Sequence, residues 1–290
     1  MRRPLFLTVI FCATLLPLTF VPAAYAQTPE AAPSGSPAVA EGFNAYQRGD
    51  YKAAYDIWLP LAEQGDAQAE FNLGVLYAHG KGLERDMATA MAWWKSAAEQ
   101  GHVRAAHNLG LALIKGEPFT QGEEPKPDYV EAMRWLKIAA EAGFPNAIYT
   151  RGKMFLEGLG VEKDPVRAAT LFQAAAEKGF ARAQYNLAKL YRDGVGVPKD
   201  EALSLYWFNE AAIRGDAKSQ ARLADRYAKG DGVKQDRVEA LKWALLAESQ
   251  GVEELGPLLE DLKAKMSPAE VETARQKAES FSPYKTQASF

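Results

Sequence analysis

The sequence predicts an all-α protein, a solenoid of αα-hairpins wound into a right-handed superhelix. A closing glycine recurs through the chain with spacings of 36, 42, 36, 36 and 36 residues. Each period also opens with a similar pattern, and in three of the five units a leucine and a tyrosine four positions apart share one face of a helix, as Leu73 and Tyr77 do. A fixed period of this length is typical of repeat architectures. The closing glycines are Gly65, Gly101, Gly143, Gly179, Gly215 and Gly251.

The first helix of each unit has a small residue in its middle. Glycine inside a helix costs roughly 1 kcal/mol relative to alanine, so its repeated use indicates close contact with a neighbouring helix. The helix is expected to end at a G-x-G turn such as Gly80-Lys81-Gly82, where glycine can adopt the left-handed cap. The small residues are Gly74, Gly110, Gly152, Ala188 and Ala224.

The second helix of each unit is expected to begin at an aspartate, whose side chain can accept hydrogen bonds from the free N–H groups of the first turn. These residues are Asp50, Asp86, Asp128, Asp164, Asp200 and Asp236. Bulky residues follow seven or eight positions later and predict the contacts between helices. They are Trp58, Trp93, Trp94, Trp135, Phe172, Trp207, Phe208 and Trp243.

This recurring pattern, A-x-A…L-G-x-x-Y…G-x-G-V…D…A…W…A-A…G, resembles the Sel1-like repeat family, a relative of the tetratricopeptide repeat. The resemblance covers about residues 41–251, with Ala244 and Glu248 as departures in the last unit. It implies a function in protein–protein interaction, often in exported bacterial regulatory or envelope systems. The units are a partial one at 41–65 and five full ones at 66–101, 102–143, 144–179, 180–215 and 216–251.

The N-terminus is typical of a cleaved secretory signal peptide over residues 1–26. Two arginines precede an apolar run from Leu5 to Val21, and Ala24 and Ala26 form an A-x-A cleavage site. An uncleaved anchor is the alternative, although threonines and Pro17 interrupt the run. We therefore expect a periplasmic protein, with secretion also open and no membrane insertion after cleavage. Residues 27–40 are rich in Pro, Ala and Ser and predict a disordered linker.

Cysteine content and net charge argue against two classes of function, thiol chemistry and nucleic-acid binding. The lone cysteine, Cys12, lies in the signal peptide, so the mature chain has no thiol ligand or nucleophile. Loss of Arg2 and Arg3 leaves 32 Lys and Arg against 37 Asp and Glu, a net charge of −5. A mildly acidic chain is a poor candidate for nucleic-acid binding.

Residues 252–290 are expected to form capping helices and a tail, because the ends of a solenoid need polar caps. An amphipathic helix is expected from Glu253 to Met266. Ser267, Pro268 and Glu270 then have the positions of a capping box at the start of a second helix.

The sequence contains no convergent set of catalytic groups, so we expect no enzyme, catalytic residue, cofactor or metal. His102 and His107 are five residues apart, unlike the i,i+4 pair of a helical zinc site. The alternative is a cell-envelope enzyme or binding protein acting on peptidoglycan, a β-lactam or a polysaccharide. Some cysteine-rich family members have been described as binding or acting on β-lactams, and this chain lacks their paired cysteines.

In related solenoids the first helices line the concave surface, and positions i, i+3, i+7 and i+10 form one stripe. Six of the twenty stripe residues are Lys or Arg and one is acidic. The stripe predicts a basic groove with aromatic patches, apolar toward its N-terminal end, that receives an acidic or extended peptide. The alternative is ordinary helix packing and a solvated charged face. The candidate residues are Phe71, Arg104, His107, Tyr149, Lys153, Arg182, Tyr185, Lys189, Arg192 and Lys218.

A second candidate for a partner-binding site is an insertion in unit 102–143, which is six residues longer than the other units. The insertion lies within the Pro-rich and acidic stretch 117–127. We expect an exposed loop there, with Phe119 as a possible anchor for a partner. The alternative is a neutral insertion, which repeat arrays tolerate. Self-association through the exposed ends of the solenoid is also open.

Overall fold

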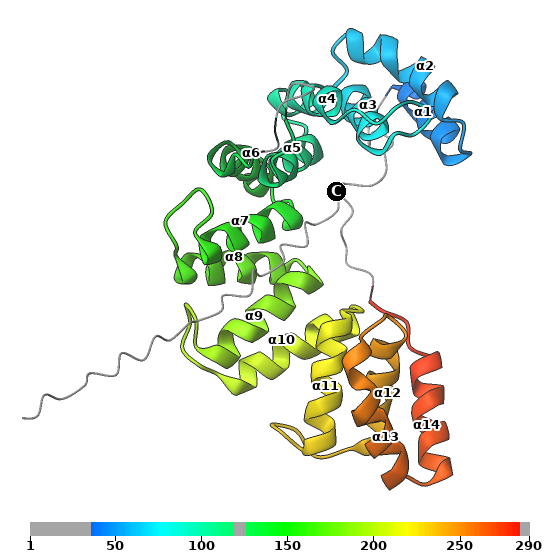
Figure 1. The fold of residues 1–290 in the computed structure, drawn as a ribbon, viewed down its shortest axis with the longest axis vertical. Coiled ribbons are helices and arrows are strands. Elements are labelled where there is room, and N and C mark those ends of the chain that lie inside the picture. Colours follow the sequence, from blue (N-terminus) through cyan, green and yellow to red (C-terminus); the bar gives the residue numbers. More distant parts are fainter. Residues whose placement is uncertain (1–35, 119–123, 125, 285–290) are drawn as a thin grey trace, which may run out of the picture.

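The computed structural model describes residues 36–118, 124 and 126–284. These residues form 14 α-helices and one short 3-10 helix, with no strand among them. The helices stack into an open arc, with α1 and α2 at one end and α11 to α14 at the other (Figure 1). The predicted signal peptide, most of the predicted linker and Phe119 lie outside the described residues. No helix in the described part is both long and apolar enough to cross a bilayer.

Six helix pairs follow one another, and each helix packs mainly against the helix before it and the helix after it. This nearest-neighbour packing is the defining feature of a solenoid. The pairs are α1 (Pro37–Gln47) and α2 (Tyr51–Glu63), α3 (Ala67–His79) and α4 (Met87–Glu99), α5 (Val103–Lys115) and α6 (Tyr129–Glu141), α7 (Pro145–Glu157) and α8 (Pro165–Glu177), α9 (Ala181–Asp193) and α10 (Glu201–Ile213), and α11 (Ala217–Lys229) and α12 (Arg237–Glu248).

Helix α1 corrects the prediction that the linker extends to residue 40. The Ser36 hydroxyl accepts a hydrogen bond from the Ala38 N–H at 3.2 Å, and Pro37 occupies the first turn. A serine followed by proline is a helix-start signal. The prediction missed it because the surrounding segment is rich in Pro and Ala, a composition typical of disorder. Val39 is fully buried, so the segment is part of the core. The unit predicted as partial is therefore a complete helix pair.

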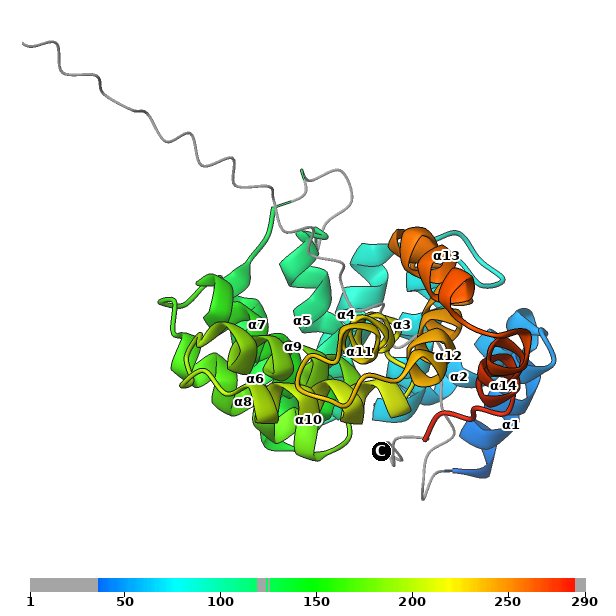
Figure 2. The same ribbon diagram turned by 90° about the horizontal axis from the view of Figure 1, so that it is seen from below.

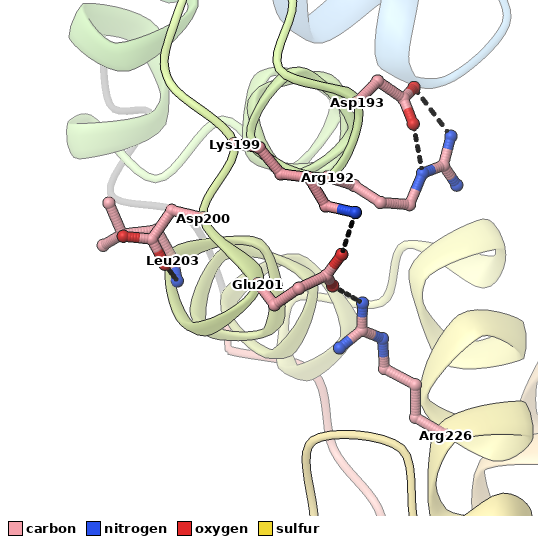
Figure 3. Close-up of polar contacts among 7 residues, drawn as sticks. All are labelled: Arg192, Asp193, Lys199, Asp200, Glu201, Leu203 and Arg226. Carbon is pink, nitrogen blue, oxygen red and sulfur yellow. Dashed lines mark hydrogen bonds and ion pairs between the residues drawn. The ribbon is translucent and has the colours of Figure 1, made fainter.

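The predicted caps are confirmed at every described helix where they were expected. Each second helix starts at an aspartate whose carboxylate accepts the N–H three residues on, as at Asp200, where the Leu203 N–H donates at 2.9 Å (Figure 3). Left-handed glycines end the first helices, with φ of 62° at Gly80 and 76° at Gly158. The full set of capping aspartates is Asp50, Asp86, Asp128, Asp164, Asp200 and Asp236.

In four of the first helices, a glycine makes room for a bulky side chain from the second helix of the same pair. A methyl group added at Gly74 would lie 2.4 Å from the Trp94 Nε1 atom. Gly110 has the same relation to Leu136, so Leu136, and not the predicted Trp135, fills this position in its unit. The remaining glycine pairs are Gly42 with Trp58 and Gly152 with Phe172.

The C-terminal segment closes one end of the stack with the 3-10 helix Glu253–Leu255, α13 (Gly256–Lys265) and α14 (Pro268–Glu279). Helices α13 and α14 pack on different sides of α12 (Figure 2). The single helix expected from Glu253 to Met266 is thus interrupted, because Gly256 and Pro257 open a new helix. The predicted capping box between Ser267 and Glu270 is confirmed.

Candidate functional site

Two of the ten predicted site residues lie in the interior, and the prediction is corrected there. Phe71 is 0% exposed and stacks on the His102 ring, with 4.5 Å between ring centroids. His107 is 1% exposed and meets the Phe144 ring edge-on at 5.1 Å. A partner docking on the surface would touch neither side chain.

The apolar N-terminal part of the predicted groove is also core. Val75, Leu111 and Ile114 are at most 5% exposed and belong to one hydrophobic cluster with Phe71. Helical spacing identified a shared face correctly, but that face packs against neighbouring helices. Arg104 lies on α5 and is half-buried.

Tyr149 has a packing role, as the alternative interpretation expected. Its ring contacts Phe172 at 5.4 Å and Phe180 at 5.3 Å, and its hydroxyl accepts a hydrogen bond from Asn186 Nδ2 at 3.1 Å. Burial raises the pKa of Tyr149 to about 12. A half-buried lysine on the same helix, Lys153, pairs with a carboxylate one turn on, Glu157, at 3.7 Å.

The remaining cations lie on α9 and α11, and two of them, Lys218 and Arg222, line one pocket with the half-buried Tyr185. We call Arg182, Lys189, Lys218 and Arg222 the basic cluster. Burial lowers the pKa of Lys189, and the positive charges of Arg192, Lys218 and Arg222 lower it further, while the Asp193 carboxylate raises it. The Lys189 ammonium lies 5.7 Å from the centroid of the Tyr185 ring. Like charges from two successive repeats are therefore brought together.

No member of the basic cluster forms an ion pair within the described part of the chain. Arg182, Lys218 and Arg222 are exposed. Arg182 and Lys218 both act on the carboxyl group of Asp216, whose pKa is nevertheless raised by burial. The charges of the cluster are thus left to solvent or to a partner.

Arg192 does not share this property. Its guanidinium donates to both carboxylate oxygens of Asp193, at 2.7 and 2.9 Å (Figure 3). These hydrogen bonds raise the pKa of Arg192 and lower that of Asp193. Nearby, Glu201 forms ion pairs with both Lys199 at 3.4 Å and Arg226 at 2.8 Å, so these two cations also have a carboxylate partner.

The basic cluster continues into an open pocket of about 640 Å³ between α11 and the C-terminal segment. Tyr185, Lys218 and Arg222 form its basic wall. Three carboxylates also line it, those of Asp225, Glu253 and Glu254, and Leu258 adds apolar surface. The pocket therefore combines two cations of α11 with carboxylates from α11 and the 3-10 helix.

Sequence reasoning missed Arg222, because the i, i+3 stripe selected Ala221 in its place. Arg222 lies one turn beyond Lys218, at i+4, which helical geometry places on the same face. Searching both spacings would have found it. Among the described residues, no group of three His, Asp or Glu side chains is arranged to hold a metal ion.

Comparison with known structures supports the repeat architecture. A Sel1 repeat protein from Oxalobacter formigenes is 29% identical, with a TM-score of 0.69, over 84% of this chain and 97% of that one. A protective antigen of uropathogenic Escherichia coli that displays an SLR fold is 28% identical, with a TM-score of 0.68 over 83% of this chain. The match spans about half of that antigen, 53% of its length.

No curated protein matches the chain. The family model described as Sel1 repeat matches five consecutive segments, residues 67–102, 103–144, 145–180, 181–216 and 217–252. These segments together make up well over half of the sequence. The chain therefore belongs to the Sel1 repeat family.

Proposed function

We propose that this chain is a non-enzymatic periplasmic scaffold that binds an acidic segment of a partner protein on the basic cluster. Sel1 repeat proteins are in general scaffolds for protein–protein interaction, and typically not enzymes. The observation that carries the proposal is a set of four cations without ion pairs on α9 and α11, of which Lys189, Lys218 and Arg222 lie beside the Tyr185 ring. The alternative of a cell-envelope enzyme or of a peptidoglycan, β-lactam or polysaccharide binder is not favoured by these relatives.

Electrostatics supports an acidic partner. The chain without its signal peptide has a net charge of −5, so a concentration of cations runs against its overall balance. Burial lowers the pKa of Lys189 most, neighbouring positive charges lower it further, and a bound carboxylate would relieve that charge repulsion. Complementary charge mainly raises association rate and specificity. Glu253 and Glu254 would repel acidic residues at the pocket rim, and so limit the direction in which a segment binds.

The basic cluster is expected to select acidic peptides over basic ones. A fluorescent hexaglutamate probe should bind the mature chain, and the triple variant R182E, K189E, K218E should bind it at least ~10-fold more weakly, as expected for loss of about 1.4 kcal/mol. Fluorescence anisotropy at low and high salt checks this, because the interaction should weaken as salt screens it.

The matched control reverses three exposed lysines that form no ion pair and do not line the pocket, Lys178, Lys234 and Lys263. Both triple variants change the net charge equally. Equal weakening by the two variants, or equal binding of a hexalysine probe, would refute a site at the basic cluster.

The periplasmic location rests on the signal-peptide pattern of residues 1–26. The expected product in the periplasmic fraction is a chain that begins at Gln27. Intact-mass measurement of the full-length protein expressed in a Gram-negative host checks this. Recovery of a chain retaining Met1 in the membrane fraction would support the uncleaved anchor instead.

A further inference from the structure

One repeat departs from the others at a core position of its first helix. Four of the five units place a leucine directly before the small residue in the middle of the first helix, and these leucines are at most 1% exposed. At the equivalent position in unit 144–179, directly before Gly152, the chain has Arg151. The four leucines are Leu73, Leu109, Leu187 and Leu223.

The Arg151 side chain forms no ion pair within the described residues. Its Nε atom is buried and makes no hydrogen bond. Burial lowers the pKa of Arg151, and the positive charge of Arg167 lowers it further. Glu141 acts on it from a distance and in the opposite direction. A buried polar atom without a partner is costly, so it calls for an explanation.

Arg151 borders a pocket of about 650 Å³ formed by α6, α7, the turn after α7 and the start of α8. Met133 and Phe155 supply its apolar wall. The Arg167 guanidinium is held over the Phe155 ring, with 4.4 Å between its central carbon and the ring centroid. Lys163 adds a third positive charge at the exposed side.

Two carboxylates also line this pocket and leave it with a small positive excess. Asp164 is engaged in capping α8, where it accepts the Arg167 backbone N–H at 2.9 Å. Glu162 is exposed. Their presence disfavours a doubly charged ligand such as phosphate. A singly charged group suits this balance better.

We propose that this pocket binds a carboxylate carried on an apolar body, with Arg151 and Arg167 as its ligands. Guanidinium groups match carboxylates in a planar, two-pronged geometry. Met133 and Phe155 would contact the apolar body, and the pocket volume lies within the range of small-ligand sites. The site is formed by α6, α7 and α8, whereas the basic cluster is on α9 and α11, so the two proposals are independent.

The carboxylate belongs either to a free organic acid or to an acidic side chain of a peptide. Isothermal titration of the mature chain with benzoate, and separately with an acetylated peptide carrying one glutamate, distinguishes these sources. We expect at least one of the two to bind. Benzamide, the uncharged analogue of benzoate, and inorganic phosphate should bind at least ~5-fold more weakly, because the two guanidinium groups recognise a singly charged carboxylate.

Two variants test the assignment of the ligands. Arg151→Leu restores the residue of the other repeats, so it should fold, resist heat better than the wild type and lose carboxylate binding. Arg167→Gln changes an exposed side chain and should weaken binding without altering the fold. Arg134→Gln is the control, because Arg134 is exposed, pairs with Glu131 at 2.7 Å and does not line the pocket.

Unchanged binding in Arg151→Leu, equal binding of benzoate and benzamide, or binding of neither carboxylate probe to the wild type would overturn the proposal. A loss in Arg134→Gln as large as in Arg167→Gln would also overturn it, because the effect would then be general charge. None of these outcomes bears on hexaglutamate binding at the basic cluster.

Discussion

Replacing Trp94 with alanine is expected to lower the free energy of unfolding by about 3–5 kcal/mol. Trp94 is 0% exposed and lies directly against Gly74, so truncation leaves a cavity between α3 and α4. Large-to-small changes at such positions lose both burial and packing contacts. Urea denaturation followed by circular dichroism measures the change. The adjacent Trp93, which is half-buried, is the control, and its replacement with alanine should lower the free energy of unfolding clearly less.

A double-mutant cycle tests the contact itself. Gly74→Ala in the wild type should destabilise, because its methyl group would meet the Trp94 indole at 2.4 Å. In the Trp94→Ala background the same change should stabilise by up to about 1 kcal/mol, since alanine is the better helix former. The sign of the Gly74→Ala effect should therefore reverse. The same sign in both backgrounds would show that the glycine is not there to admit the indole.

The second large effect is a loss of stability at low pH, caused by the buried His107. Burial, aided by the charge of Arg104, lowers the pKa of His107 to about 4, whereas an unfolded histidine titrates near 6.5. Between these values the unfolded chain binds the proton and the folded chain does not, so stability falls as pH falls through this window. From pH 7 to pH 5 this one group should cost about 2 kcal/mol.

His107→Leu should remove that part of the acid sensitivity while the fold is kept. Urea unfolding at pH 7 and pH 5 measures how much free energy of unfolding each protein loses in acid, and the loss in the variant is then compared with that in the wild type. His102, whose pKa is also lowered to about 4 mainly by burial, stays in both proteins, so part of the acid loss should remain. Identical pH dependence of the two proteins would contradict a neutral, buried His107.

The repeat could be predicted from the sequence because its signals are local. The carboxylate of an aspartate caps a helix by accepting from N–H groups of the first turn, and a left-handed turn favours glycine. The roles of Asp200 and Gly80 can therefore be predicted without tertiary information. The start of α1 was missed because the Ser36-Pro37 signal lies in a stretch whose overall composition is typical of disorder. The exact packing partner, Leu136 in place of Trp135, depends on a one-residue rotation that periodicity alone does not determine.

The binding surface was predictable only in part. Helical spacing shows which residues share one face of a helix, but it does not show whether a neighbouring helix packs on that face. Phe71 and His107 share the stripe with exposed cations but are covered by neighbouring repeats. The sequence predicts Arg192 as a binding residue because it is positively charged, yet its guanidinium forms an ion pair with the adjacent Asp193. Arg182, Lys189 and Lys218 remain on the surface, as the stripe predicted, and the structure adds Arg222.

Photo-crosslinking in intact cells from a photoreactive residue at Lys218 most directly tests whether the chain binds a partner protein on the basic cluster. The exposed Lys234, which does not line the pocket, provides the control position. We expect a partner protein to be captured from position 218 and not from 234, and the adduct to disappear when Arg182, Lys189 and Arg222 are changed to glutamate. The same adducts from both positions, or an adduct that survives the charge reversal, would contradict this function.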